Sequence, residues 1–383
     1  MMILILPFMQ MQSGHHQVAD AIAAHIKKQD PSQEVEKLDI FNYTFPRIEK
    51  MISRIYLSWI QKHPVSYSKF YAKQFNQQTY NFKPFSPWEN LMEETLERII
   101  LEKKPEAVIC THSFPSHAVG NLKVKGHISM PVINAYTDFF AGGVWAKDGV
   151  DLHLVPSKAV GEHLKTTFDI APEQILISGI PVHPAMTRVK QVKSSKSKHL
   201  LVAGGNSGLG DIASLTAQCS AYPDTHFSVL CGNNQKLFDT LQKSKVPNVT
   251  PLAYISSREE MNALYEQVDG IITKPGGVTI SEAFVKRIPI FVASVLPGQE
   301  QINMDYLIPK QLVYPIDAAQ PAIAQVMNVL EDEVQCARFE RAITAYEQDI
   351  ELNTERFIEQ VLHILPRDHY KSRKRFNKLA LLS

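Results

Sequence analysis

The chain alternates short apolar runs with polar or glycine-containing loops and with segments of helical periodicity. Met2 to Leu6 is a continuous apolar run, typical of a strand buried in a parallel sheet, and Val18 to Lys28 carries apolar residues at helical spacing. The same order then recurs. Further strands are predicted at Ala107–Thr111, Val132–Tyr136, Leu152–Val155, Ile175–Ser178, His199–Ala203, Phe227–Cys231, Val249–Leu252, Val268–Thr273 and Ile288–Ala293. Repeated strand–helix units predict an α/β fold built from doubly wound parallel sheets.

A change of composition divides this series in two. The segment TRVKQVKSSKSKH, from Thr187 to His199, is basic and serine-containing and lacks apolar periodicity. We therefore expect a Rossmann-like domain at 1–186, a linker at 187–198 and a second Rossmann-like domain at 199–345, with the two domains facing each other across a cleft. Periodicity predicts a helix from Arg338 to Leu365, whose part 346–365 is expected to pack back on the first domain. Residues 366–383 form a basic tail.

Composition narrows the class of protein. The chain has 383 residues, of which 44% are hydrophobic and 21% charged, as in soluble globular proteins. Its net charge of +1 gives no reason to expect nucleic acid as a partner. The four cysteines are widely spaced, which argues against a zinc site and fits a reducing cytoplasm. No signal peptide or membrane span is evident, so any contact with a membrane is expected to be peripheral.

One stretch, Phe41 to Trp88, is unusual in its side chains. It contains thirteen aromatic and seven basic residues, and Glu49 is its sole acidic residue. Aromatic and basic side chains together suit the headgroup zone of an anionic bilayer. The alternative is that the aromatics form a core and the lysines a solvated face. We expect this stretch to face a membrane, and the basic tail is either disordered or a second membrane contact.

The strongest chemical signal lies in VDGIITKPGGVTISEA, from Val268 to Ala283. It predicts a buried strand, a Lys-Pro-Gly-Gly turn and a helix that begins near Thr279. Glycines let an anion approach the backbone, and the first turn of a helix offers N–H groups without an internal partner. Thr279 and Glu282 also have the spacing of a capping box, and a Gly-Gly pair is ordinary in turns. Phosphate binding and a purely structural turn both remain open for this stretch.

The first predicted strand is followed by a loop with Gly14, His15 and His16. Ligands of open α/β sheets bind at the carboxyl ends of the strands, which makes these histidines candidates for chemistry. A surface or helix-capping histidine is the alternative. No Asp-x-Asp pair occurs, so a metal-chelated diphosphate is not expected and no metal or other cofactor is predicted. Glycine loops in both halves point to a nucleotide diphosphate as the ligand.

Several motifs, taken in order, resemble GT-B glycosyltransferases of the processive diacylglycerol glucosyltransferase and monogalactosyldiacylglycerol synthase type. These enzymes are related to the glycosyltransferase that makes peptidoglycan lipid precursors. The most specific matches are ITKPGGVTISEA (Ile272–Ala283) and PGQEQIN (Pro297–Asn303). The others, spread over nearly the whole chain, are GHHQVA (Gly14–Ala19), TDFF with VW (Thr137–Trp145), VPSKAV (Val155–Val160), GIPVHP (Gly179–Pro184) and CGNN (Cys231–Asn234).

This resemblance implies transfer of a hexose, with inversion, from a UDP-sugar to a lipid hydroxyl. UDP-glucose and diacylglycerol are the expected substrates, and the inner face of the cell membrane is the expected location. The catalytic residues it implies are His15, as general base or as stabiliser of the acceptor oxygen, and Asp138, which orients His15 or is itself the base. Glu282 would accept both ribose hydroxyls. The implied UDP-sugar-binding residues are Gly14, Asn206, Gly232, Asn234, Ile255, Lys274, Gly276, Gly277, Val278, Glu282, Gln299 and Glu300.

Two departures from the family pattern concern the acceptor. The first loop reads QSGHH, where close relatives show a richer Gly-x-Gly-His form, and the stretch Phe139–Gly143 lacks the histidine that usually precedes the Val/Ile-Trp pair. Two other functions stay open on the sequence. One is a UDP-sugar 2-epimerase of the same fold, and the other is a nucleotide-sugar-binding protein without catalysis.

Overall fold

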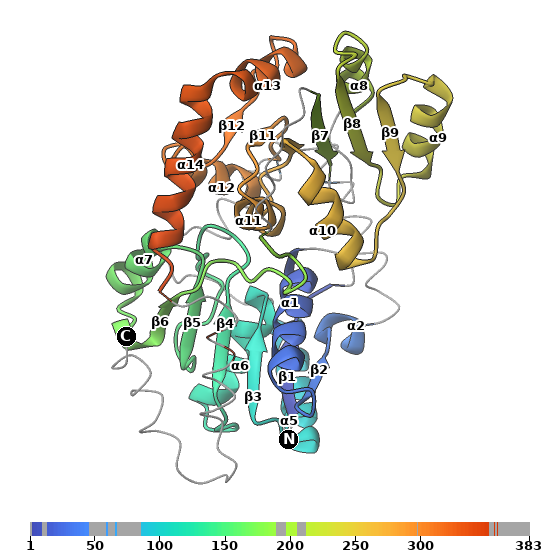
Figure 1. Ribbon diagram of the computed structural model, residues 1–383. Coiled ribbons are helices and arrows are strands. Elements are labelled where there is room, and N and C mark those ends of the chain that lie inside the picture. Colours follow the sequence, from blue (N-terminus) through green and yellow to red (C-terminus); the bar gives the residue numbers. More distant parts are fainter. Residues whose placement is uncertain are drawn as a thin grey trace. The chain divides into compact units, whose positions relative to one another are not determined.

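The computed structural model describes residues 2–9, 14–45, 59, 66, 86–188, 197–204, 212–296, 298–351, 356 and 358. The chain divides into two compact units (Figure 1). Unit 1 comprises Met1–Pro184 together with Gln348–Ser383, and unit 2 comprises Ala185–Glu347. Nearly all of the membrane-facing stretch predicted at Phe41–Trp88, and the basic tail, lie outside the described residues.

Unit 1 is built on a six-stranded parallel sheet in the order β2-β1-β3-β4-β5-β6. The strands are β1 (Met2–Leu6), β2 (Glu34–Lys37), β3 (Ala107–Cys110), β4 (Val132–Ala135), β5 (Leu152–Val155) and β6 (Ile175–Ile177). The helices are α1 (Gly14–Gln29), α2 (Ile40–Thr44), α5 (Ser86–Lys103), α6 (Ser113–Val124), α7 (Lys158–Phe168) and the 3₁₀ turn η1 (Pro172–Gln174).

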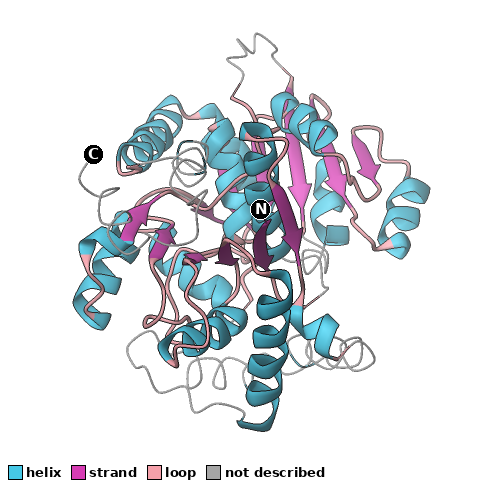
Figure 2. Cartoon of the chain, turned by 90° about the horizontal axis from the view of Figure 1, so that it is seen from below, coloured by secondary structure: helices cyan, strands magenta, loops and turns pink. Residues whose placement is uncertain are grey.

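The strand order reverses between β1 and β3. From β1 the chain moves one way to β2, and from β3 it moves the other way to β4. Right-handed crossovers then place α1 and α6 on opposite faces of the sheet. Figure 2 shows the helices flanking the strands. Every residue of β1, β3, β4 and β5 is buried, which explains the continuous apolar runs of β1 and β3. β4 and β5 each include one buried polar residue, Asn134 and His153.

Unit 2 has a second six-stranded parallel sheet, in the order β12-β11-β10-β7-β8-β9. Its strands are β7 (Lys198–Ala203), β8 (Thr225–Leu230), β9 (Val249–Leu252), β10 (Gly270–Thr273), β11 (Ile290–Val292) and β12 (Tyr314–Pro315). Its helices are α8 (Ile212–Cys219), α9 (Gln235–Ser244), α10 (Arg258–Gln267), α11 (Gly277–Lys286), α12 (Gln299–Leu307), α13 (Ala322–Glu331) and α14 (Glu333–Gln348). Here the order reverses between β7 and β10.

The predicted helix from Arg338 to Leu365 is not continuous, although Arg356 and Ile358 within it are helical. Helix α14 begins at Glu333 and ends at Gln348. Three residues later Glu351 belongs to unit 1, where its N–H donates to the carbonyl of Ile177 at 2.9 Å and its carboxylate accepts the Ile177 N–H at 3.2 Å. Both bonds are made at the edge strand β6. Pairing with the free edge of a sheet therefore interrupts the predicted helix after Gln348, which periodicity alone could not reveal.

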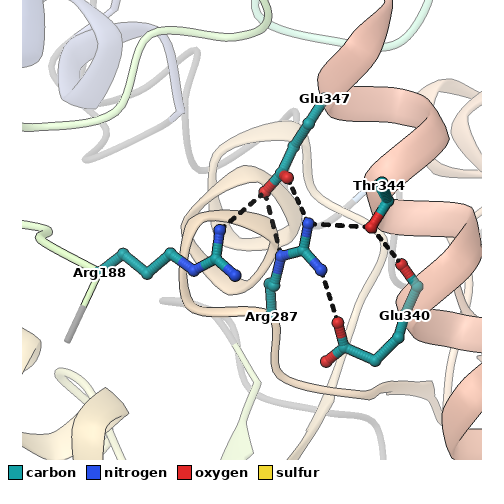
Figure 3. Close-up of polar contacts among 5 residues, drawn as sticks. All are labelled: Arg188, Arg287, Glu340, Thr344 and Glu347. Carbon is teal, nitrogen blue, oxygen red and sulfur yellow. Dashed lines mark hydrogen bonds and ion pairs between the residues drawn. The ribbon is translucent and has the colours of Figure 1, made fainter. Parts of the chain in front are cut away.

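Helix α11 is fixed at its C-terminal end by an arginine cluster (Figure 3). Arg287 ends the helix in the left-handed conformation, at φ 53°. Its guanidinium donates to Glu340 Oε2 at 2.6 Å, to Thr344 Oγ1 at 3.0 Å and to both carboxylate oxygens of Glu347, all on α14. Arg188 adds a longer ion pair to Glu347, at 3.9 Å. The contacts of Arg287 thus hold one end of α11, whose other end carries the glycine turn, against α14.

Candidate functional site

In unit 1 the loops that follow β1, β3 and β4 meet around His15. His15 is the second residue of α1, and its Nδ1 lies 3.0 Å from the carbonyl oxygen of Thr111 and 2.9 Å from the hydroxyl of Thr137. That hydroxyl lies 3.4 Å from Oδ2 of Asp138. The position is the switch point of the sheet, between β1 and β3, where open α/β folds bind their ligands.

These contacts fix the tautomer of His15. Because a carbonyl oxygen can only accept, Nδ1 carries the proton and donates it to Thr111. The hydroxyl of Thr137 can then donate to the carboxylate of Asp138. Nε2 is left with its lone pair, and none of the described residues donates a hydrogen bond to it. The arrangement is that of a general base whose second nitrogen is held by its neighbours.

The surroundings of His15 keep it neutral. His112 meets it edge-on with the ring centroids 4.4 Å apart, and His112 is itself stacked on Phe8 and Phe114. Burial lowers the pKa of His15 below its ordinary value, and the charge of Asp138 opposes that shift. Burial lowers the pKa of His112 further, well below its ordinary value. At neutral pH the imidazole of His15 is therefore available to take a proton.

The two histidines that the sequence placed together have different surroundings. His16 Nε2 lies 2.7 Å from the carbonyl of Met9 and 3.6 Å from Asp39, so it joins the first turn of α1 to these two residues. Gly14 begins α1 directly before His15. Thr137 and His112, which complete the cluster, were not predicted as site residues. The position of THSFPSH after β3, next to β1 in the sheet, is the signal that could have found His112.

The loop that carries Asp138 is held by a buried lysine. Lys147 is 5% exposed, and its Nζ donates to the carbonyls of Gly142 and Trp145 at 3.1 and 3.0 Å. It also lies 4.5 Å from the centre of the Phe168 ring. Burial lowers the pKa of this amine to about 7. A glycine-rich loop is thus fixed at two carbonyls, and no motif in the sequence indicated this role of Lys147.

In unit 2 the Lys-Pro-Gly-Gly turn lies at the carboxyl end of β10, beside the switch point with β7. The helix starts at Gly277 and not near Thr279, and Gly276 is its N-cap residue without any side-chain cap. The capping-box alternative for Thr279 and Glu282 is therefore wrong. A Gly-Gly pair can enter the helix directly because it has no side chain that would bond the backbone elsewhere. Glu282 becomes the sixth residue of α11.

Gly276 is a glycine that the fold itself does not require. Its φ of −78° is open to any residue, and a Cβ added there would meet no atom within 4 Å. The neighbouring turn is well fixed, because Asn303 of α12, fully buried, donates from Nδ2 to the carbonyl of Pro275 at 2.9 Å. Beside a fixed turn there is open space next to helix N–H groups. Such a place suits an anion that approaches the backbone closely.

The carboxylate of Glu282 is buried, at 6% exposure, between α10 and α11. Tyr265 donates its hydroxyl to Oε2 at 3.1 Å, and Arg258 Nη1 lies 3.8 Å from Oε1. Burial raises the pKa of Glu282, while Arg258 and the bond from Tyr265 oppose the rise. Neither Arg258 nor Tyr265 was predicted from the sequence. They lie seven residues apart, so they share one face of α10.

The second polar loop leads into α12. Gly298 has a φ of 96°, which favours glycine, and it precedes Gln299 at the start of the helix. Glu300 accepts the N–H of Leu296 at 2.7 Å through Oε2. This bond links the first turn of α12 to Leu296 after β11. Gln299 is half-buried in the first turn.

The remaining predicted residues of unit 2 lie at the same edge of the sheet. Gly232 follows β8 at a φ of 56°, and Asn234 uses its side chain to cap α9 by accepting the N–H of Leu237 at 3.0 Å. That bond gives Asn234 a structural role. Ile255 is half-buried after β9, and Lys274 is half-buried after β10. Asn206, in the loop after β7, lies outside the described residues.

The predicted residues thus form one group in each unit. In unit 1, Gly14, His15 and Asp138 come together at the switch point. In unit 2, the residues described follow β8, β9, β10 and β11 at the carboxyl edge. Within the part of the chain that the structure describes, no group of three or more His, Cys, Asp or Glu could hold a metal ion. No helix of that part is long and apolar enough to cross a membrane.

Comparison with solved structures identifies the fold of the chain. MurG of Acinetobacter baumannii superimposes with a TM-score of 0.59 at 14% identity, covering 95% of this chain and 100% of that one. UDP-GlcNAc 2-epimerase from Neisseria meningitidis, bound to UDP-GlcNAc, gives a TM-score of 0.54 at 12% identity, covering 95% and 99%. The two doubly wound parallel sheets, together with the similarity to these structures, define the fold as GT-B, which glycosyltransferases and epimerases share.

Proteins similar in sequence show which of the two classes, glycosyltransferase or epimerase, the chain belongs to. An uncharacterized glycosyltransferase, YkoN, of Bacillus subtilis (strain 168) is 37% identical over 313 residues, covering 81% of this chain and 83% of that protein. Processive diacylglycerol β-glucosyltransferase of Bacillus cereus (strain B4264) is 29% identical over 340 residues, covering 86% of each. Residues 15–182 match the family model described as monogalactosyldiacylglycerol (MGDG) synthase. The protein is a glycosyltransferase. It belongs to the family of MGDG synthases and processive diacylglycerol glucosyltransferases.

Proposed function

We propose that this protein transfers a hexose from a UDP-sugar, with UDP-glucose as the first choice, to the hydroxyl of diacylglycerol, with inversion at the anomeric carbon. The observation that carries the proposal is the state of His15. Its Nδ1 proton is committed to Thr111 and its Nε2 is unprotonated, at the carboxyl edge of a sheet. An unprotonated imidazole in that place can take the proton of an attacking hydroxyl.

Each residue of unit 1 has a role in this reaction. His15 Nε2 accepts the hydroxyl proton of the acceptor as its oxygen attacks the sugar. The imidazolium that forms is stabilised by the charge of Asp138, relayed through the hydroxyl of Thr137. Lys147 holds the backbone of the loop that carries Asp138. A single direct displacement by an activated hydroxyl inverts the anomeric carbon.

Unit 2 is proposed to bind the donor. The N–H groups of Gly277 and Val278, at the start of α11, would hold the diphosphate beside the open side of Gly276. Glu282 would accept the ribose hydroxyls, and Gln299 and Glu300 would bind sugar hydroxyls. As the diphosphate leaves, the helix dipole stabilises its growing charge without a metal.

Diacylglycerol is proposed from the relatives, since the B. cereus protein is a diacylglycerol β-glucosyltransferase and the matched family model is that of MGDG synthase. An acceptor of this kind lies in a bilayer. The protein is accordingly proposed to act as a peripheral protein on the inner face of the cell membrane, with the basic and aromatic stretch Phe41–Trp88 against anionic lipid.

The test uses liposomes with and without diacylglycerol, incubated with the protein and either radiolabelled UDP-glucose or UDP-galactose. Label is expected in a glycolipid in the presence of diacylglycerol, and the β anomer in the product would establish inversion. His15→Ala is expected to lose ~10² to 10⁴ of turnover while it still binds UDP. The matched control is His127→Ala, which removes a surface histidine paired with Glu97 in the same unit.

Three results would contradict the proposal. One is full activity of His15→Ala, which would remove the imidazole from the mechanism. Another is interconversion of UDP-sugars without any lipid, which would assign the chain to the epimerases of the same fold. The third is UDP binding without transfer to any lipid, which would make the protein a nucleotide-sugar-binding protein.

A further inference from the structure

The contact between α10 and α11 buries a carboxylate in a defined orientation. Glu282 on α11 meets two residues of α10, and these are Arg258 at its first position and Tyr265 two turns later. Asn262 and Glu266 lie on the same face of α10, where Glu266 pairs with Lys286 at 3.2 Å. That ion pair joins the two helices without Glu282. Because burying a carboxylate costs free energy, a role of Glu282 beyond joining the helices is indicated.

The two carboxylate oxygens of Glu282 make different contacts. Oε2 accepts a hydrogen bond from the hydroxyl of Tyr265 at 3.1 Å, which prevents rotation of the carboxylate plane. Oε1 has Arg258 at 3.8 Å, beyond hydrogen-bond distance, and accepts no hydrogen bond from any residue that the structure describes. A carboxylate has about four lone-pair sites, and Tyr265 occupies one of them. Acceptor capacity for two further hydroxyl groups is left.

The charge of Glu282 matters as much as its orientation. Burial alone favours the protonated carboxyl, which would use one oxygen as a donor. Arg258 and the bond from Tyr265 both favour the ionised form, which accepts at both oxygens. The Tyr265 hydroxyl itself stays a donor, because burial and the charge of Glu282 raise its pKa well above the ordinary value.

We propose that Tyr265, through its hydrogen bond, and Arg258, through its charge, are positioning residues, which orient the carboxylate of Glu282 as the acceptor for the two ribose hydroxyls of the donor nucleotide. The inference rests on the proposed function, since it needs a ribonucleotide in unit 2. It assigns selectivity for a ribonucleotide over a deoxyribonucleotide to three side chains on two helices. The turn at Gly276 holds only the diphosphate and takes no part in that selectivity.

Calorimetric titration of the full chain with UDP and with 2′-deoxy-UDP tests the proposal. The wild type is expected to bind UDP about tenfold more tightly than 2′-deoxy-UDP, the effect of one hydrogen bond to a charged group. Tyr265→Phe is expected to weaken UDP about tenfold and 2′-deoxy-UDP less than about threefold, so that the ratio approaches one. Arg258→Gln is likewise expected to lower the ratio of the affinity for UDP to the affinity for 2′-deoxy-UDP towards one.

The matched control is Tyr314→Phe. It removes a hydroxyl that donates to the carbonyl of Gln335 at 2.8 Å, in the same unit but on the edge strand β12. Its two affinities are expected to stay within about twofold of the wild type. Thermal unfolding of each variant is measured alongside, so that a loss of folded protein is corrected for in the titration.

The outcomes separate the inference from the function on which it rests. If Tyr265→Phe weakens both nucleotides equally, or neither, the tyrosine only joins two helices and the inference is overturned. Equal binding of both nucleotides by the wild type overturns the role of Glu282 at ribose while UDP binding stands. Failure of the wild type to bind either nucleotide overturns the proposed function and this inference together.

Discussion

The open side of Gly276 makes a prediction that separates ligand binding from folding. In Gly276→Ala the new methyl group meets no protein atom within 4 Å, and the φ of −78° suits alanine. Alanine is a poorer N-cap residue than glycine by roughly 0.5–1 kcal/mol, while the unfolded chain loses about 0.4–1 kcal/mol of conformational freedom. These terms oppose each other, so the free energy of unfolding is expected to change by less than about 0.5 kcal/mol.

Binding of UDP responds differently to the same methyl group. The methyl group introduced by Gly276→Ala would occupy the space in which a phosphate approaches the N–H groups of Gly277 and Val278. Loss of one charge-assisted hydrogen bond costs about 1.5–3 kcal/mol. Since about 1.4 kcal/mol is a factor of ten, the affinity for UDP is expected to fall about 10- to 100-fold.

The assay pairs calorimetric titration of UDP with thermal unfolding. A shift of Tm below about 2 °C is expected for Gly276→Ala, given its small effect on the free energy of unfolding. Gly270→Ala is the matched control, because its Cβ would lie 3.0 Å from Leu200 and 3.1 Å from Phe291 in the core of the same unit. That variant should unfold earlier, with UDP affinity kept in the folded fraction. Unchanged UDP affinity in Gly276→Ala would refute the reasoning.

Two further predictions concern titrating groups of unit 1. In Asp138→Asn the charge that raises the pKa of His15 is lost, so the acid limb of kcat/KM should move to lower pH while turnover falls by up to about 10²; an acid limb that moves to higher pH would contradict the relay. Burial lowers the pKa of His153 to about 3 from an ordinary 6.5, so the unfolded chain binds the extra proton and stability is lost as pH falls below 6.5. The loss is about 2 kcal/mol at pH 5, and His153→Gln should remove that much of the difference between denaturant unfolding at pH 5 and pH 8; an undiminished difference would exclude His153 as its source.

In the part of the chain that the structure describes, the hydrophobic pattern identified ten of the twelve strands, each within a few residues of its observed bounds. The two that were missed are both edge strands. Glu34–Lys37 reads EVEK and pairs only with β1, so it needs no apolar run. Tyr314–Pro315 is two residues long and pairs only with β11. A strand at an edge is defined by its partner's hydrogen bonds, which a pattern of apolar residues does not record.

The residues of the candidate site likewise fall into those that the sequence pattern could identify and those that it could not. His15, Asp138 and Glu282 could be named because they follow strands and match family motifs. Thr137, His112 and Lys147 could not, since their roles depend on which loops the sheet order brings together. Tyr265 was hidden for another reason, because a tyrosine on an amphipathic helix is indistinguishable by pattern from an ordinary core residue.

By itself the sequence determined the alternation of strands and helices, the glycine turns and the family, because these follow from local spacing and ordered motifs. The tertiary structure alone decided the tautomer of His15, the orientation of Glu282 and the end of α14. Each of those depends on partners far away in the chain: Thr111, Tyr265 and Ile177. Hydrogen bonds between distant residues are set by strand order and helix packing, which no local pattern of side chains encodes.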